Sequence, residues 1–182
     1  MLRGVACTFA GLMLAMTGTF AHADDTHWTA TPEGYAAHLS DVGAWEFSAL
    51  KNGPDGKPEC YETWTFNADG TGSVLSGEQR IGLSWWYAKD DLVGMVLRIK
   101  YNSSTAGKDC LGREIDPGAY PKKDRGGLEL LFFNEGKRAT VCNAPRVLVD
   151  EKGEFRKGPD GKPITLQSMD NCWGSLRPAS AN

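Results

Sequence analysis

The chain has 182 residues, a usual size for one domain with its own core. Its 20 basic and 23 acidic residues give a formal charge of −3, and the cations are interspersed with acids rather than gathered in a stripe. This pattern excludes the usual kind of nucleic-acid-binding surface. Six Trp, five Tyr and seven Phe, with 22 Gly and nine Pro, favour a β-rich chain with many turns over a helical bundle.

The first 23 residues have the three-part layout of a secretory signal peptide. Arg3 precedes an apolar run, Gly4 to Phe20, which ends in Ala21-His22-Ala23 before Asp24. The run is too short to remain as a membrane-spanning helix, which needs about 20 solidly apolar residues. An N-terminal anchor helix is the alternative. We predict that residues 1–23 are removed and that the mature protein is periplasmic or secreted, without stable membrane insertion.

Residues 24–42 form the predicted N-terminal helical segment. The one stretch with helical character runs from Trp28 to Val42, where Thr31-Pro32-Glu33 offers an N-cap, a proline in the first turn and an early acid. Gly43 supplies a stop signal. Only two or three turns fit, so we expect a lid or plug, with His38 on its polar side.

From residue 43 to residue 182 the pattern predicts a barrel domain. Apolar and polar side chains alternate, most clearly where Met95, Leu97, Ile99 and Tyr101 face away from Arg98 and Lys100. About eight such strands follow one another at meander spacing, near residues 44–49, 60–66, from 69 onward, 83–87, 95–101, 128–133, 138–142 and within 164–176. The predicted fold class is all-β: an eight-stranded up-and-down antiparallel barrel with a short N-terminal helix.

The connections between these strands are of two kinds. Residues 67–70, 89–91 and 134–136 have the Asx and Gly chemistry of tight hairpin turns, whereas residues 51–58, 102–127 and 144–163 are long links. In a meander, alternate connections lie at opposite ends, so we expect a closed floor and a mouth of long loops. The hexapeptide Gly53–Pro58 recurs as Gly158–Pro163, which we interpret as turn chemistry rather than duplication.

Four cysteines follow the leader, Cys60, Cys110, Cys142 and Cys172. An even number in an exported domain indicates two disulfides, and their wide spacing is unlike the close pairs of a zinc site. Three pairings are possible. A bridge Cys110–Cys142 would tie the longest loop to a strand end and leave Cys60–Cys172 to fix the last strand.

Gly43-Ala44-Trp45 opens the first strand after a helical turn, and the third strand begins Asp69-Gly70-Thr71. With the eight-strand meander, these residues resemble the lipocalin-like (calycin) β-barrel group, as an outlying member that lacks a T-D-Y segment. The resemblance implies a closed barrel around an apolar pocket. It further implies that Trp45 closes the barrel floor and that Arg177 is the candidate for the arginine that packs over this tryptophan.

No catalytic motif is present, so we do not expect an enzyme. Only His27 and His38 follow the leader, too few for a histidine-based triad or metal site. The carboxylates of residues 90–91 and 109–124 lie in turn-like sequence without the spacing of a calcium loop. We therefore predict neither a metal site nor a cofactor.

Inward-facing aromatic and aliphatic residues are the candidates for ligand contact: Phe47, Trp64, Phe66, Trp85, Tyr87, Leu97, Ile99 and Phe132. The alternative is that they only fill a small barrel. Two functions remain open. The first is a carrier or sensor of a small apolar ligand at the loop-rich mouth. The second is a protein–protein interaction module, such as an inhibitor of an envelope hydrolase, acting through loops that the disulfides stiffen.

Overall fold

The computed structural model describes residues 30–114, 116–119, 124–166 and 168–180. The predicted signal peptide, residues 1–23, lies outside the described residues. The elements in chain order are α1 (Pro32–Val42), β1 (Ala44–Ala49), β2 (Tyr61–Phe66), β3 (Thr71–Ser76), β4 (Gln79–Asp90), β5 (Gly94–Ser104), β6 (Asp124–Phe133), β7 (Arg138–Asn143), β8 (Arg146–Val147), β9 (Thr165–Leu166) and β10 (Cys172–Pro178).

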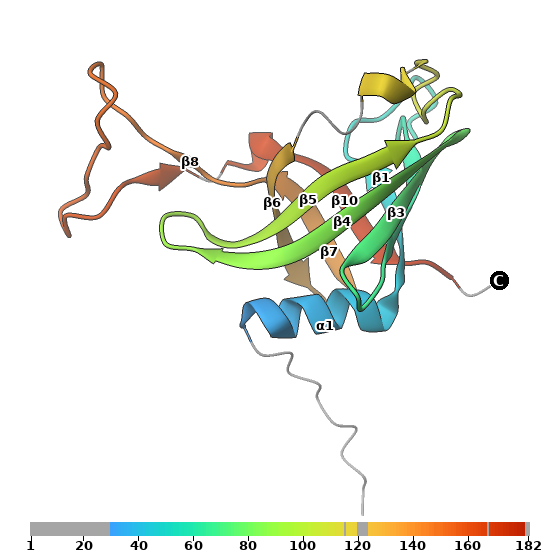
Figure 1. The fold of residues 1–182 in the computed structure, drawn as a ribbon. Helices are drawn as coiled ribbons and strands as arrows, with labels where there is room; N and C mark the ends of the chain where they lie inside the picture. Colours follow the sequence, from blue (N-terminus) through green and yellow to red (C-terminus); the bar gives the residue numbers. More distant parts are fainter. Residues whose placement is uncertain (1–29, 115, 120–123, 167, 181–182) are drawn as a thin grey trace, which may run out of the picture.

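Eight of these strands close into one barrel, in the order β1-β10-β7-β6-β5-β4-β3-β2 (Figure 1). Every neighbouring pair is antiparallel. Up to β7 each strand pairs with the next along the chain, and β10 then closes the ring against β1. The prediction of an eight-stranded antiparallel barrel preceded by a short helix is confirmed.

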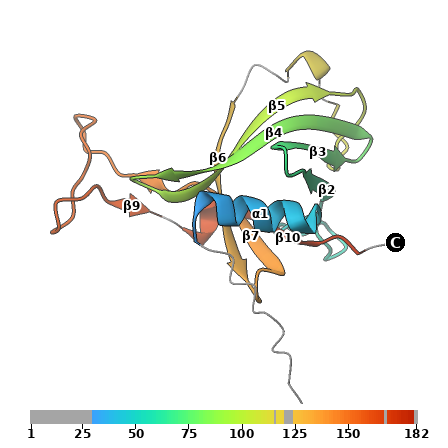
Figure 2. The ribbon, with the colours of Figure 1, turned by 60° about the horizontal axis from the view of Figure 1, so that its bottom comes forward.

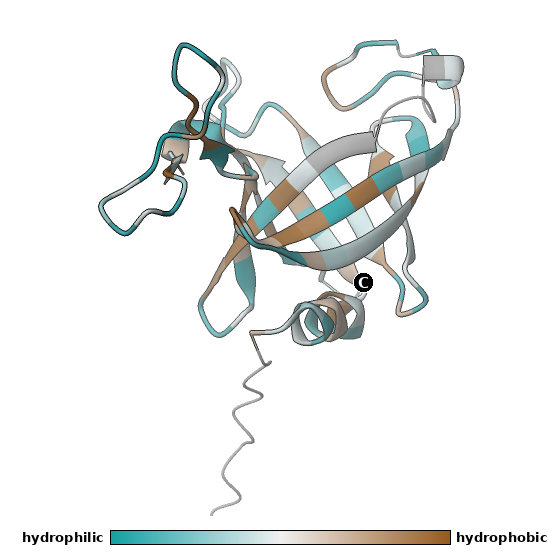
Figure 3. Cartoon of the chain, turned by 60° about the vertical axis from the view of Figure 1, so that its left-hand side comes forward, coloured by the Kyte–Doolittle hydropathy of each residue, from teal (hydrophilic) through white to brown (hydrophobic). Residues whose placement is uncertain are grey.

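The alternation of side chains decides which face of each strand points inward. In β4, Leu83, Trp85 and Tyr87 are buried, whereas Trp86 between them is 48% exposed. Their partners on β5 follow the same rule, since Trp85 lies opposite the buried Ile99. Figure 3 shows apolar and polar residues alternating along the strands of the barrel wall. The inner face of the barrel wall is therefore apolar and buried, and the outer face is in contact with solvent.

Helix α1 begins and ends at the residues that its capping chemistry predicts. The Oγ1 atom of Thr31 accepts a hydrogen bond from the Gly34 N–H over 3.1 Å, and Pro32 opens the first turn. Gly43, at a φ of 73°, ends the helix and donates its N–H to the Leu39 carbonyl. The helix starts at Pro32, directly after the predicted N-cap Thr31, whereas Trp28, where the predicted helical stretch begins, lies outside the described residues.

The helix lies across one end of the barrel and closes it (Figures 1 and 2). Leu39 is fully buried there, and its carbonyl accepts a hydrogen bond from the indole Nε1 of the equally buried Trp45 over 3.1 Å. The short turns β2–β3, β4–β5 and β6–β7 lie at this same end, which we call the floor. Of the two roles expected for this helix, a lid or a plug, its position at the floor corresponds to the plug.

His38 does not lie on the polar side of α1, where the sequence placed it. Its Nε2 atom lies 2.9 Å from the carbonyl oxygen of Gly136 in the β6–β7 turn. Its ring contacts Phe132 edge-on, with centroids 5.2 Å apart. His38 lies on the face of α1 that packs against the barrel, as Leu39 does. The Gly136 carbonyl in the β6–β7 turn supplies the polar partner that the imidazole needs there.

The opposite end is the mouth. The long links β1–β2, β5–β6 and β7–β10 leave the barrel there, together with the short β3–β4 turn. Thus the separation of floor and mouth that the connection lengths predict is confirmed.

Residues 144–166 form an arm that projects from the side of the mouth (Figure 1). Strands β8 and β9 pair at its base. Beyond them three segments form a ring of backbone hydrogen bonds, in which Leu148 donates to Ile164, Ile164 to Arg156 and Arg156 to Leu148, over 2.8–2.9 Å. The predicted last strand, placed within 164–176, is thereby divided: residues 165–166 belong to the arm, and the barrel strand starts at Cys172.

The repeated hexapeptides form the same turn. Gly53 donates to the Lys57 carbonyl and Gly158 to the Lys162 carbonyl, each over 2.8 Å. In both turns the aspartate side chain accepts the lysine backbone N–H over 3.1 Å. One turn lies in the β1–β2 link and the other in the arm, which supports the turn interpretation.

Candidate binding site at the barrel mouth

Two disulfides lie at the mouth, Cys60–Cys110 and Cys142–Cys172. The predicted pairing of Cys110 with Cys142 and of Cys60 with Cys172 is wrong. Cys142 and Cys172 are register partners on neighbouring strands β7 and β10. The link between β5 and β6 meanwhile folds back over the β3–β4 turn, as the bond from Glu78 N–H to the Lys108 carbonyl shows, and this path brings Cys110 to the start of β2.

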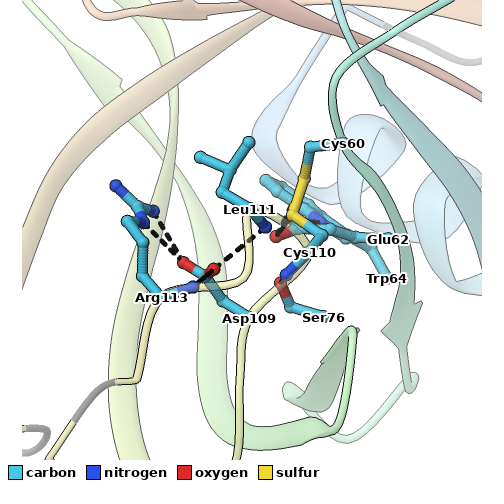
Figure 4. Close-up of a disulfide and its surroundings, with 8 residues drawn as sticks. All are labelled: Cys60, Glu62, Trp64, Ser76, Asp109, Cys110, Leu111 and Arg113. Carbon is cyan, nitrogen blue, oxygen red and sulfur yellow. Dashed lines mark hydrogen bonds and ion pairs between the residues drawn. A yellow bond between two sulfur atoms is a disulfide. The ribbon is translucent and has the colours of Figure 1, made fainter. Parts of the chain in front are cut away.

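Asp109 fixes the loop that carries Cys110 (Figure 4). Its Oδ1 accepts the backbone N–H groups of Leu111 and Arg113, and its Oδ2 accepts the Arg113 Nε–H, each over 2.9 Å. Burial by itself raises the pKa of Asp109, but these bonds and the Arg113 charge outweigh it, so the pKa lies below the ordinary 3.8. These bonds hold the turn next to the disulfide in a fixed geometry.

A cleft of about 400 Å³ opens between this loop and the ends of β1, β2 and β10. Its apolar wall consists of Phe47, Ala49, Leu50, Leu111, Cys172, Trp173 and the Cys60–Cys110 bridge. Its polar lining consists of Lys51, Glu59, Glu62 and Arg113. The volume lies within the range of small-molecule sites, about 300–1,000 Å³.

Three aromatic rings lie together at the base of the cleft. Phe47 stacks on Trp64, with ring centroids 5.4 Å apart and planes 13° from parallel. Trp173 packs against both rings, at 5.1 Å from Phe47 and 6.1 Å from Trp64. The β7–β10 register shifts between Cys172 and Gly174, and this bulge re-aims the Trp173 side chain toward the barrel axis.

Glu62 is a polar member of the site that the sequence analysis missed. It lies in β2 on the same face as Cys60 and Trp64, because side chains two residues apart share a face. Its Oε2 accepts the Trp64 Nε1–H over 2.7 Å, and its Oε1 lies 3.6 Å from the Cys110 sulfur (Figure 4). The sequence pattern that could have predicted it is a glutamate two residues before the inward-facing Trp64.

Of the eight predicted ligand-contact residues, Phe47 lines the cleft and Trp64 lies directly behind it. The other six lie deeper in the barrel: Phe66, Trp85, Tyr87, Leu97, Ile99 and Phe132. Phe66 contacts Trp64 on one side and Trp85 on the other, at 6.3 and 5.2 Å. These contacts are those of a packed core, and ligand contact by the six stays a prediction.

Of the three residues assigned from the lipocalin-like resemblance, two lie where the resemblance implies and one does not. Gly43 ends α1 and Trp45 is buried at the floor, in the places expected. Arg177 is exposed on the outer face and forms an ion pair with Glu46, its register partner on β1. It therefore cannot pack over Trp45, because adjacent residues of a strand point to opposite faces and the partner of Trp45 is Pro178.

Within the described residues, Cys60, Glu62 and Cys110 are the one group whose potential metal-ligating atoms lie within 4.8 Å of one another. The two sulfurs are joined in a disulfide and carry no thiolate, so this group offers a metal only the Glu62 carboxylate.

No protein-family model matches the chain, and searches of the curated proteins and of the solved structures also return no match. Within the described part of the chain, no helix has the length and apolar character needed to cross a bilayer.

Proposed function

We propose that this chain is an exported, non-enzymatic binding protein that takes a small apolar ligand in the cleft at the barrel mouth. The observation that carries the proposal is the cleft itself, which combines an aromatic base with a loop fixed by a disulfide. A site whose walls are fixed before binding loses little conformational entropy on binding, so modest apolar contact suffices for affinity.

The binding test uses a neutral apolar dye, N-phenyl-1-naphthylamine, whose fluorescence rises in apolar sites. We expect saturable binding by the purified protein and a loss of affinity of at least about tenfold in Leu111→Asp, because a charge in the apolar wall must be desolvated. The matched control is Leu131→Asp, since Leu131 is 37% exposed against 41% for Leu111 but lies outside the cleft. Absence of saturable binding, or equal loss in both variants, would contradict the proposal.

Export is supported by the leader-like residues 1–23 and by two disulfides, which persist in oxidising compartments. The two disulfides are consistent with a periplasmic or secreted protein. N-terminal sequencing of the protein recovered from outside the cytoplasm should begin at Asp24. Recovery of the intact leader on cytoplasmic protein would contradict export.

A second candidate function, a protein–protein interaction module such as a hydrolase inhibitor, is favoured by the arm. Val149, Phe155 and Leu166 are each about half exposed there, at 52%, 51% and 51%. A photo-cross-linking amino acid at Phe155 should give one discrete protein adduct in envelope extract, whereas the same probe at the exposed Leu75 of β3 should not. Identical adduct patterns at the two positions would rule out the arm as a specific docking element.

A further inference from the structure

The mouth cleft contains one carboxylate whose charge the described residues leave uncompensated. The two cations of its lining each have their own partner, Lys51 with Glu59 at 2.8 Å and Arg113 with Asp109 at 2.7 Å. Glu62 takes part in none of the ion pairs among the described residues. The base of the cleft is thus negative, although its rim is balanced.

The surroundings of Glu62 stabilise its charge only in part. One oxygen accepts the Trp64 indole N–H, and the other lies 3.6 and 3.9 Å from the sulfurs of Cys110 and Cys60. Sulfurs joined in a disulfide carry no proton, so the second oxygen receives no hydrogen bond from them. A neutral apolar ligand that fills the cleft would strip water from this oxygen and give nothing in return, which is unfavourable.

The aromatic rings beside this carboxylate suit a positive charge. Phe47 and Trp173 line the cleft, and their packing against Trp64 places the rings near the Glu62 side chain. A cation near such rings is attracted by their π faces, and a carboxylate at the same place adds a charge-assisted hydrogen bond. An anion would meet the unpaired charge of Glu62 and be repelled.

We propose that the cleft selects ligands that join an apolar body to a cationic amine, with Glu62 as the counter-charge. The inference rests on the proposed function of the cleft as a small-molecule site and specifies the ligand class. The amine donates a hydrogen bond to the Glu62 oxygen that receives none from the disulfide, and the apolar body lies along Leu50, Leu111 and the disulfide.

The test displaces bound N-phenyl-1-naphthylamine with three ligands that share one chain, namely octylamine, octanol and octanoate. We expect octylamine to displace the dye at a concentration at least about tenfold lower than octanol, and octanoate to be the weakest. In Glu62→Gln, which keeps an acceptor for the Trp64 N–H, octylamine and octanol should come within about twofold of each other. The matched control, Glu46→Gln, removes the same charge from the outer face and should keep the tenfold preference.

A second measurement needs no variant. A water-soluble carbodiimide couples a carboxylate to a neighbouring amine, forming an amide while the carbodiimide takes up water as its urea. With octylamine bound, the peptide that carries Glu62 should be modified well ahead of the exposed Glu154, which takes part in none of the ion pairs among the described residues, and excess dye should suppress this labelling. Equal labelling of Glu62 and Glu154, with or without dye, would overturn the assignment of the counter-charge.

The outcomes separate the two proposals. If the dye binds but octylamine and octanol displace it equally in the wild type, the charge selectivity is wrong and the carrier function stands. If the preference persists in Glu62→Gln, Glu62 is not the counter-charge and the inference fails. If the dye does not bind at all, the proposed function fails and takes the inference with it.

Discussion

The imidazole of His38 and the carbonyl of Gly136 join two segments that lie 98 residues apart, across a distance of 2.9 Å. This contact fastens the floor helix to the β6–β7 turn. Asn134 and Glu135 enter that turn with positive φ angles of 53° and 55°, and Gly136 follows at 76°. A side chain at residue 136 would need both a left-handed backbone and the space that the His38 ring occupies.

Gly136→Ala should therefore lower the free energy of unfolding by about 2 kcal/mol or more, the sum of backbone strain and a clash with His38. The control is Gly153→Ala, where φ is 82° but no atom lies within 4 Å of the added carbon, so only the strain of about 1 kcal/mol applies. Urea unfolding measures both. In the background His38→Ala the two alanine variants should become equal, and a persistent difference would show that His38 does not confine Gly136.

Tyr87→Phe should leave stability at neutral pH unchanged or raise it by about 1 kcal/mol. The Tyr87 hydroxyl is buried without a hydrogen-bond partner among the described residues, so its removal abolishes a desolvation cost. Tyr61→Phe, at a side chain 49% exposed, is the control and should change nothing. A loss of more than about 1 kcal/mol in Tyr87→Phe would show that the hydroxyl has a partner after all.

The same tyrosine predicts a pH dependence. Burial, and secondarily the nearby Tyr35, raises the pKa of Tyr87 well above the ordinary 10.0. The neutral phenol is favoured in the folded state, so its contribution is fully present below about pH 10 and is lost as the pH rises further. Unfolding measured at pH 7 and at alkaline pH should show the wild type losing more stability than Tyr87→Phe, and parallel losses would contradict the shift.

Peptide mass mapping without reductant should recover Cys60 linked to Cys110 and Cys142 linked to Cys172. The bridges close segments with sequence separations of 50 and 30, and each should contribute about 2–4 kcal/mol by restricting the unfolded chain. Reductant should then lower the melting temperature by more than about 10 °C. Four free thiols together with an unchanged melting curve would show that the bridges do not form.

Gly174→Ala should disturb the cleft from inside the barrel. A Cβ atom at residue 174 would overlap the Phe47 ring, which would have to leave its stacked position on Trp64. We expect a loss of about 1–3 kcal/mol and weaker dye binding. Ser175→Ala, which loses only the bond to Ser48 on the outer face, should cost about 1 kcal/mol and leave dye binding intact. Unaltered dye affinity in Gly174→Ala would exclude Phe47 from the site.

The barrel could be predicted from the sequence because side chains that alternate with period two place all apolar residues on one face of the sheet, and that face becomes the interior when the sheet closes. Trp85 and Trp86 show this well, since neighbours of identical chemistry are 4% and 48% exposed. The floor followed from connection lengths, and the helix ends from Thr31 and Gly43. These features depend on residues within a few positions of one another.

The cleft could not be predicted in the same way. Trp173 faces inward because of a bulge, and Cys110 reaches Cys60 because a long link folds back over the β3–β4 turn. Neither depends on a local pattern. The outward position of Arg177 could not be predicted for a related reason, since its face depends on the register of β10 against β1. Of these residues, only Glu62 could have been predicted, because it lies two residues before Trp64 in β2 and therefore on the same inward-facing side.

The Cys142–Cys172 bridge spans the two points where the projecting arm leaves the barrel. A protease that nicks the arm anywhere between these residues would leave both fragments covalently attached, and all eight barrel strands would keep their pairing. Cleaved protein would migrate as one species until reductant separates it into two. The exposed arm can thus be cut without loss of the domain that it extends from.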